Sequence, residues 1–146
     1  MGEIVGAGLI SHAPTVMLPE ATRHEINDGK EISLVPGLMR LKDEVFARLQ
    51  PDTIVIVDSH WFTTVEHVLS SHPHRSGKMT SSELPRGMAA VPYDYDGDPE
   101  LARLAADLGQ ELGTPTHASD DEYLPVYYAT VNLLHYLHSD EKVVSV

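Results

Sequence analysis

The chain has 146 residues, which is enough for one domain with a hydrophobic core. Its 10 Lys and Arg residues stand against 22 Asp and Glu residues, and the formal net charge of −12 argues against nucleic acid or an anionic membrane surface as a partner. The chain contains no cysteine, which excludes disulfides, thiolate metal sites and a cysteine nucleophile.

The N-terminal stretch predicts a strand followed by a long loop. Residues 3–10 (EIVGAGLI) form an apolar run that ends at Ser11 and His12, and Pro14 prevents a regular ladder from continuing. This stretch lacks the basic region of a signal peptide and is too short for a membrane span, so a soluble, cytoplasmic protein is expected. Residues 15–36 show no clean periodicity and predict a long loop, with a short helical turn, over the strand ends.

The next stretch predicts a helix and a second strand. Leucine and valine recur at helical spacing over residues 37–50, which indicates an amphipathic helix. Residues 53–57 (TIVIV) form a β-branched run, typical of a strand buried on both faces, and the chain then turns polar at Asp58, Ser59 and His60. The helix would be a right-handed crossover that makes the strands near 3–10 and 53–59 parallel.

The second half of the chain predicts further strands and helices. They are a strand over 64–70, a turn-rich linker over 72–77, a loop over 80–98, a helix over 98–112 with Leu101, Leu104, Ala105, Leu108 and Leu112 buried, a strand-like stretch over 113–116, a helix over 125–138, and the opening of a strand at 142–146 (KVVSV). The predicted fold class is α/β, with a parallel-containing (mixed) central sheet and helices on both faces.

The apolar sequence at 142–146 has two interpretations. It is either a short edge strand or the start of a core strand in a longer chain. We expect the second, an incomplete domain whose exposed last strand makes the isolated piece prone to association.

Two histidines follow predicted strands in matching Ser-His contexts. Ligands bind at the carboxyl ends of strands in open α/β sheets, so His12 and His60 are expected at one sheet edge, with ring nitrogens within roughly 3–4 Å of a common metal position. The alternative is that both histidines only cap loop backbone. Asp58 is a candidate to orient His60 by accepting its other ring N–H. His117 follows a strand-like stretch and is a candidate for a supporting role at the same edge.

Two imidazoles need a third ligand, and a carboxylate would complete the facial triad of non-haem Fe(II) oxygenases. Five glutamates lie in predicted loops, and the sequence singles out none of them: Glu20, Glu25, Glu31, Glu83 and Glu122. The remaining histidines are expected to be surface or packing residues: His24, His67, His72, His74, His135 and His138.

With ISHAP at 10–14 and DTIVIVDSHW at 52–61, the sequence resembles the class III extradiol ring-cleavage dioxygenases, the superfamily of the protocatechuate 4,5-dioxygenase catalytic subunit. The stretches at 81–85, 93–109 and 142–146 are most similar to its homoprotocatechuate (3,4-dihydroxyphenylacetate) 2,3-dioxygenase branch. The resemblance implies that residues 1–146 are the N-terminal part of a single catalytic domain.

The same resemblance implies a chemistry. His12 and His60 match the two metal-binding histidines, with Fe(II) as the ion and Mn(II) as the alternative. The glutamate ligand and the acid–base histidine of the family lie beyond Val146, so no catalytic residue is expected within this chain. The implied reaction is the opening of a catechol ring with both atoms of O₂, and this chain alone is expected to be inactive.

Several points stay open at this stage. The expected partners are a catechol-type substrate, O₂, and either further copies of the chain or the C-terminal half of the same enzyme. Many relatives carry His-Gly or Tyr-Gly and then Val-Pro within the region 122–132, where this chain has Tyr127, Tyr128, Val131 and Asn132. The alternatives are a non-enzymatic or metal-binding accessory domain of the same fold, or a metal-dependent hydrolase. The sequence does not identify which catechol would be used.

Overall fold

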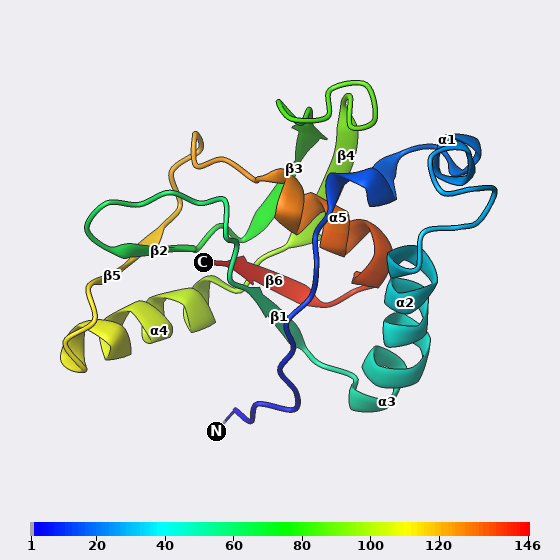
Figure 1. The fold of residues 1–146 in the computed structure, drawn as a ribbon. Helices are drawn as coiled ribbons and strands as arrows, with labels where there is room; N and C mark the ends of the chain where they lie inside the picture. Colours follow the sequence, from blue (N-terminus) through cyan, green and yellow to red (C-terminus); the bar gives the residue numbers. More distant parts are fainter. Residues whose placement is uncertain (1) are drawn as a thin grey trace.

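A computed structural model describes residues 2–146 and shows a mixed α/β fold, which confirms the predicted class (Figure 1). The helical segments are η1 (Pro14–Met17, a 3₁₀ turn), α1 (Glu20–Glu25), α2 (Leu34–Arg40), η2 (Leu41–Phe46, a π-helix), α3 (Ala47–Leu49), α4 (Pro99–Glu111) and α5 (Tyr128–Leu137). The strands are β1 (Thr53–Ile56), β2 (His67–Ser70), β3 (His74–Met79), β4 (Val91–Asp96), β5 (Thr116–Ser119) and β6 (Lys142–Ser145). None of the helices within residues 2–146 has the length and apolar character needed to cross a membrane.

The strands form three two-stranded ladders that meet at β6. β1 pairs with β6 and β2 pairs with β5, both in parallel, whereas β3 and β4 are antiparallel. The other edge of β6 lies against the ends of two further strands: Val143 forms a parallel bridge with Gly97, and the Ser145 N–H donates to Ser70 Oγ at 2.9 Å. β6 is therefore the central strand of the molecule.

Helices cover both faces of this central strand. Val143 and Val144 are consecutive in β6, so their side chains point to opposite faces. Val143 is fully buried with Leu134 of α5, and Val144, 1% exposed, packs with Ala102 of α4. The prediction of helices on both faces is confirmed.

The expected exposure of the last strand is wrong. Val143, Val144 and Ser145 are all buried, because β6 has β1 along one edge and the β2 and β4 ends along the other. The apolar run at 142–146 is thus a core strand, and it is not available for edge-to-edge association.

The predicted strand over residues 3–10 is also wrong. These residues have no regular secondary structure, and Ile4 and Leu9 are exposed. Among the described residues β1 pairs only with β6, and glycines in the N-terminal stretch weaken its strand propensity. The stretch nevertheless runs in the predicted direction. A Cβ at Gly6 would lie 3.0 Å from Leu49, which precedes β1, and His12 contacts His60, which follows β1.

The predicted helix before β1 is confirmed with an earlier start. The helical residues are continuous from Leu34 to Leu49, and Pro36 is tolerated because it lies in the first turn. Gln50 ends the helix in the left-handed conformation (φ 46°), and Pro51 follows it.

The hairpin of β3 and β4 was not predicted, because its strands carry little apolar periodicity. Residues 72–77 were expected to be a linker and 80–98 a loop, yet Arg75 and Tyr95 pair and are buried. A Cβ at Gly77 would lie 2.6 Å from the Tyr93 hydroxyl, so the Tyr93 ring lies over the position opposite it and would have to shift to admit a side chain there.

Helix α4 is present as predicted, but it buries a different stripe. Ala102 and Ala106 are buried, whereas Leu104 and Leu108 are 55% and 47% exposed. Small residues let α4 approach β2 and β6 closely; Leu104, Leu108 and Leu112 face outward, whereas the predicted Leu101 and Ala105 are partly buried against the core. The strand expected at 113–116 is β5, at Thr116–Ser119.

Candidate metal centre

His12 and His60 meet at the end of β1. His12 lies just before η1, and His60 lies in the turn that follows β1. Their Nε2 atoms are 2.8 Å apart, and the two partly buried rings meet edge to face, with centroids 4.8 Å apart and an interplanar angle of 85°. The structure thus brings together the two histidines that the sequence singles out.

Asp58 fixes the turn that carries His60. Its buried carboxylate accepts the His60 backbone N–H at 2.8 Å through Oδ1, and the Thr130 N–H and hydroxyl at 3.1 and 2.7 Å through Oδ2. Asp58 was expected to accept a ring N–H of His60, but it binds the backbone instead. This carboxylate therefore attaches the β1 turn to the first turn of α5.

Asn132 holds the other histidine from the same helix. Its Nδ2 donates to the His12 carbonyl oxygen at 2.9 Å, and the side chain is fully buried. One turn further along, the Tyr136 hydroxyl donates to the Val16 carbonyl at 2.6 Å. Helix α5 thus holds the backbone of both segments that carry the histidines.

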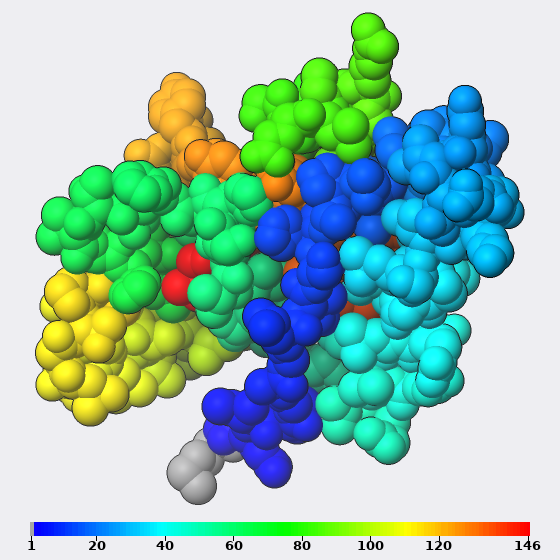
Figure 2. All heavy atoms as spheres, viewed as in Figure 1, coloured from blue at the N-terminus to red at the C-terminus, as the bar shows by residue number. Residues whose placement is uncertain are grey.

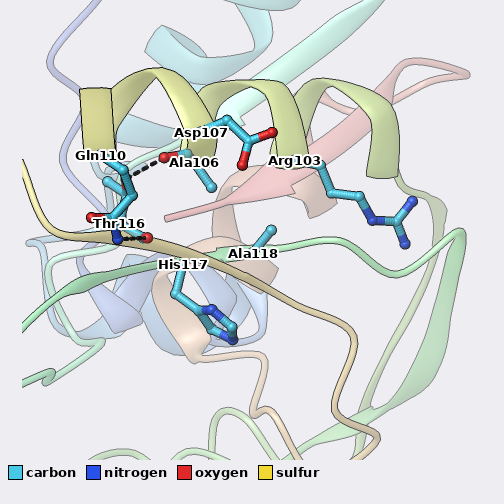
Figure 3. A pocket seen from close by; sticks show the side chains of 7 residues that line it. All are labelled: Arg103, Ala106, Asp107, Gln110, Thr116, His117 and Ala118. Carbon is cyan, nitrogen blue, oxygen red and sulfur yellow. Dashed lines mark hydrogen bonds between the residues drawn. The ribbon is translucent and has the colours of Figure 1, made fainter. Parts of the chain in front are cut away.

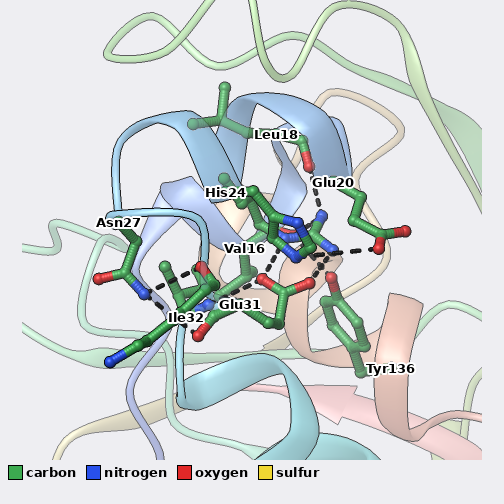
Figure 4. A network of polar contacts seen from close by, with 10 residues as sticks. Val16, Leu18, Glu20, His24, Asn27, Glu31, Ile32 and Tyr136 are labelled. Atoms are coloured by element: carbon green, nitrogen blue, oxygen red, sulfur yellow. Dashed lines mark hydrogen bonds and ion pairs between the residues drawn. The ribbon is translucent and has the colours of Figure 1, made fainter.

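A second network stiffens the loop after η1 (Figure 4). The Arg23 guanidinium donates to both carboxylate oxygens of Glu31, at 2.7 and 2.5 Å, and also to the Leu18 carbonyl. These hydrogen bonds from Arg23 hold the pKa of Glu31 below its ordinary value of 4.5, at about 2. The pair closes the loop and so supports the segment that carries His12.

Tyr128 lies beside the paired imidazoles. Its hydroxyl is 2.9 Å from His60 Nε2 and donates to Glu83 Oε2, also at 2.9 Å. Burial, followed by the hydrogen bond to the Glu83 carboxylate, raises the pKa of Tyr128 to about 12. The hydroxyl is therefore protonated at neutral pH and acts as a hydrogen-bond donor at this site.

His117 lies elsewhere in the molecule. It is an exposed residue of β5 beside a hollow of about 420 Å³ against α4, and its ring points away from that helix (Figure 3). His12 and His60 do not line this hollow. His117 is thus not among the residues that surround the histidine pair.

The other histidines, which were expected to be surface or packing residues, are all exposed or partly buried. His72 and His138 contact backbone carbonyls, His74 contacts Asp96, and His24 lies 3.8 Å from Glu20. Within residues 2–146, no three His, Asp or Glu side chains converge closely enough to hold a metal ion.

The pair fits two ligands of one ion. Two nitrogens at about 2.1 Å from a metal lie about 3.0 Å apart in adjacent octahedral positions and about 3.4 Å apart at a tetrahedral angle. The observed 2.8 Å, which is also the length of a hydrogen bond between the two rings, is close to both separations, so the two nitrogens can face one ion. Imidazole nitrogens bind several divalent transition metals, including iron and zinc, so the pair fits such an ion without selecting one.

A mixed α/β fold with two imidazoles converging at a strand end defines a candidate mononuclear metal protein. Residues 6–146 match the family described as the catalytic LigB subunit of aromatic ring-opening dioxygenase, and the chain belongs to this family. It is also 31% identical over 151 residues to the 3,4-dihydroxyphenylacetate 2,3-dioxygenase of Escherichia coli. That alignment covers 100% of this chain and 52% of the relative, so the chain spans about half of the relative's length.

Sequence reasoning named Tyr128 and Asn132 only as departures from the pattern of relatives and did not predict that they support the histidine pair. Tyr128 and Asn132 are four positions apart, so they share a helix face, and both are buried polar residues. The four-residue spacing of two polar residues in an otherwise apolar helix was the sequence signal that could have identified them. Glu83 had no such signal, because its position depends on how the loop before β4 folds.

Proposed function

We propose that this chain supplies the two-histidine part of the metal centre of an extradiol dioxygenase. His12 and His60 would bind Fe(II), or alternatively Mn(II), through Nε2. A further polypeptide segment would supply the anionic ligand and the acid–base residue. The whole enzyme would open the ring of a catechol such as 3,4-dihydroxyphenylacetate with O₂.

One observation carries the proposal, the 2.8 Å approach of the two Nε2 atoms. The family and the printed activity of the E. coli relative support the choice of reaction. The bound ion would hold the catechol oxygens and O₂ together.

The residues of this chain would have distinct tasks. Asp58 and Asn132 would hold the backbone of His60 and His12, so that both rings keep one orientation without the ion. The Tyr128 hydroxyl, already beside His60 Nε2, would donate a hydrogen bond to an oxygen atom bound at the centre. Glu83 would accept from Tyr128 in the metal-free protein.

Metal binding is the first test. We expect anaerobic titration of the chain with Fe(II), followed by calorimetry, to show one weak site per chain, since two neutral imidazoles leave the charge of the ion uncompensated. His60→Ala should weaken the affinity by more than about tenfold, because it removes a ligand and not merely a supporting group. His117→Ala is the matched control and should leave affinity unchanged. Equal affinities for all three proteins would contradict the proposal.

Oxygen consumption is the second test. The chain alone should show no turnover with 3,4-dihydroxyphenylacetate or protocatechuate after Fe(II) is added. A chimera that continues into the uncovered half of the E. coli relative should consume O₂ in a catechol-dependent way. Turnover by the chain alone would mean that a carboxylate such as Glu83 completes the site.

A second candidate function rests on one observation, the lack of a third ligand within residues 2–146. It is a metal-binding or non-enzymatic accessory domain of the same fold. This candidate predicts metal binding in the chimera without catechol-dependent O₂ uptake, which separates it from the dioxygenase.

A further inference from the structure

Three buried polar groups that lie near one another have no hydrogen-bond partner among the described residues. They are the Nη1 atom of Arg75 on β3, the hydroxyl of Tyr95 on β4 and the hydroxyl of Ser145 on β6. These residues are 8%, 3% and 1% exposed. Buried polar groups are nearly always hydrogen-bonded, so a cluster of three without partners calls for a physical reason.

The three groups belong to one face of the sheet. Arg75 and Tyr95 are paired in register, so their side chains lie on the same side of the hairpin. Tyr95 packs with Val143 of β6, and Ser145, two positions further on, points to the same side of β6 as Val143. Burial raises the pKa of the Tyr95 hydroxyl, and the nearby Arg75 charge and Ser145 hydroxyl act against this rise. The Tyr95 hydroxyl is therefore protonated at neutral pH and can donate.

Arg75 brings a positive charge into this buried cluster. Its Nη2 atom donates to the Leu124 carbonyl oxygen, which is neutral. Within residues 2–146, no carboxylate forms an ion pair with the guanidinium. A buried charge is costly unless an opposite charge accompanies it, so the cluster is suited to an anion.

The loop of residues 120–125 covers Arg75 without neutralising its charge. Of its acidic residues, Asp120 lies 3.9 Å from Arg103, and Asp121 accepts a backbone N–H within the loop. In Figure 2, the orange segment that contains this loop lies at the surface of the molecule. The cluster therefore lies beneath a surface loop, and local opening of this loop would admit a small ion.

We propose that Arg75, Tyr95 and Ser145 form a binding site for a small monovalent anion, of which chloride is the best fit. One guanidinium N–H and two hydroxyl groups would donate to the ion from three different strands. Donors that surround a point suit a spherical ion, whereas a planar carboxylate is bound best by two parallel N–H groups of one guanidinium. Nη2 already serves the Leu124 carbonyl. The site is separate from the histidine pair and independent of the proposed function.

The net charge of the chain makes the expected effect specific. At a formal charge of −12, the long-range field of the protein repels anions, so affinity for chloride would come from the local donors alone. Bound chloride would offset the charge of Arg75 in the folded state only. Chloride should therefore stabilise the folded chain as a ligand does, in proportion to its occupancy of the site.

Thermal unfolding in different sodium salts tests the proposal. The chain is unfolded in chloride and in gluconate at equal ionic strength, so that general screening is the same and only chloride is small enough for a buried site. When chloride is present at about ten times its Kd, the melting temperature should be about 3–6 °C higher than in gluconate. Equal melting temperatures would overturn the proposal, and the three groups would then be hydrogen-bonded to water. A larger effect of acetate than of chloride would overturn the choice of a spherical ion.

Single substitutions assign the effect to the three side chains. Tyr95→Phe and Ser145→Ala each remove one hydroxyl and should weaken chloride binding by about tenfold or more, because each loses a hydrogen bond to a charged group. Arg75→Met should abolish the chloride effect. Tyr93→Phe is the matched control, since Tyr93 lies on the same side of the hairpin, and it should leave the effect unchanged. A chloride effect that survives Arg75→Met would overturn the site.

Chloride NMR measures binding without unfolding the protein. The chloride signal should broaden on addition of the wild-type chain, and bromide should reverse the broadening by competition. The two hydroxyl variants keep this measurement decisive if Arg75→Met does not fold. The competing explanation is that Glu122, in the covering loop, acts as the counter-ion in solution. In that case no salt would broaden or compete, Glu122→Gln would destabilise the chain in every salt, and the proposal would be wrong.

Discussion

Asn132 Nδ2 donates a 2.9 Å hydrogen bond to the carbonyl oxygen of His12, across 120 positions of sequence. The helix that holds this asparagine also holds the turn that carries His60, through Thr130 and Asp58. The orientation of the histidine pair is therefore set by α5, and substitutions on α5 should change the site without touching either ring.

Asn132→Leu should release His12 from α5. The loss leaves a carbonyl without its donor, and we expect the free energy of unfolding to fall by about 1–3 kcal/mol and the affinity for Fe(II) to fall by about 10–100-fold. Tyr136→Phe is the matched control, because it also removes one hydrogen bond from α5 to a backbone carbonyl, that of Val16. It should reduce stability, measured by urea unfolding, and leave metal affinity unchanged. Similar affinities for both variants would show that Asn132 does not position His12.

Asp58→Asn should be destabilising although it keeps the shape of the side chain. The buried carboxylate accepts three hydrogen bonds, and the amide that replaces one oxygen would present a donor to another donor. We expect a loss of about 1–3 kcal/mol in urea unfolding. Thr130→Val removes one of the three donors and should cost about 1 kcal/mol. If the loss of unfolding free energy in the double variant equals the sum of the losses in the two single variants, the two side chains are not directly coupled.

Tyr128→Phe should loosen the loop before β4. The hydroxyl is the link between α5 and Glu83, so its removal should speed hydrogen exchange over residues 81–89. Tyr127→Phe is the control from the adjacent position, since the Tyr127 hydroxyl makes no hydrogen bond within the described part of the chain. Equal exchange in both variants would mean that the loop is held by other contacts, such as those of Ser81.

The Arg23–Glu31 pair predicts a pH dependence of stability. The pKa of Glu31 in the folded protein is about 2, below its ordinary value of 4.5, so its carboxylate stabilises the folded state above pH 4.5. This contribution is lost as the pH falls from 4.5 towards 2. Glu31→Gln should therefore lower the melting temperature at pH 7. Between pH 4.5 and 2 the melting temperature of this variant should fall less steeply than that of the wild type.

Glu44→Gln is the control for this measurement. Glu44 pairs with Arg40 on a helix surface, and both side chains are largely exposed, at 61% and 74%. Solvent screening should make its effect on the acid profile small. A profile for Glu31→Gln that matches the wild type would show that the loop network adds no stability.

The sequence predicted α4, α5, β1 and β6 from their apolar runs and periodicity, although the stripe that α4 buries differs from the predicted one. It predicted the meeting of His12 and His60 although the strand over 3–10 is absent, since the stretch still runs alongside β1 to the same end. The β3–β4 hairpin was missed because its strands carry little apolar periodicity, and its pairing joins residues that show no common local pattern, such as Arg75 and Tyr95. The hydrogen bonds of Asp58 and Asn132 depend on where α5 packs, and that position is set by contacts distant in sequence.

The central place of β6 has a consequence for how this protein folds. Thr53 pairs with Lys142, so the ladder that organises the core joins stretches far apart in sequence. Such non-local pairing raises the contact order and slows folding, because a long loop must close before the contact stabilises it. During synthesis on the ribosome, β1 emerges well before β6 and holds its apolar side chains without a partner until residues 142–145 arrive. During this interval the apolar side chains of β1 are open to non-native contacts that the finished ladder prevents.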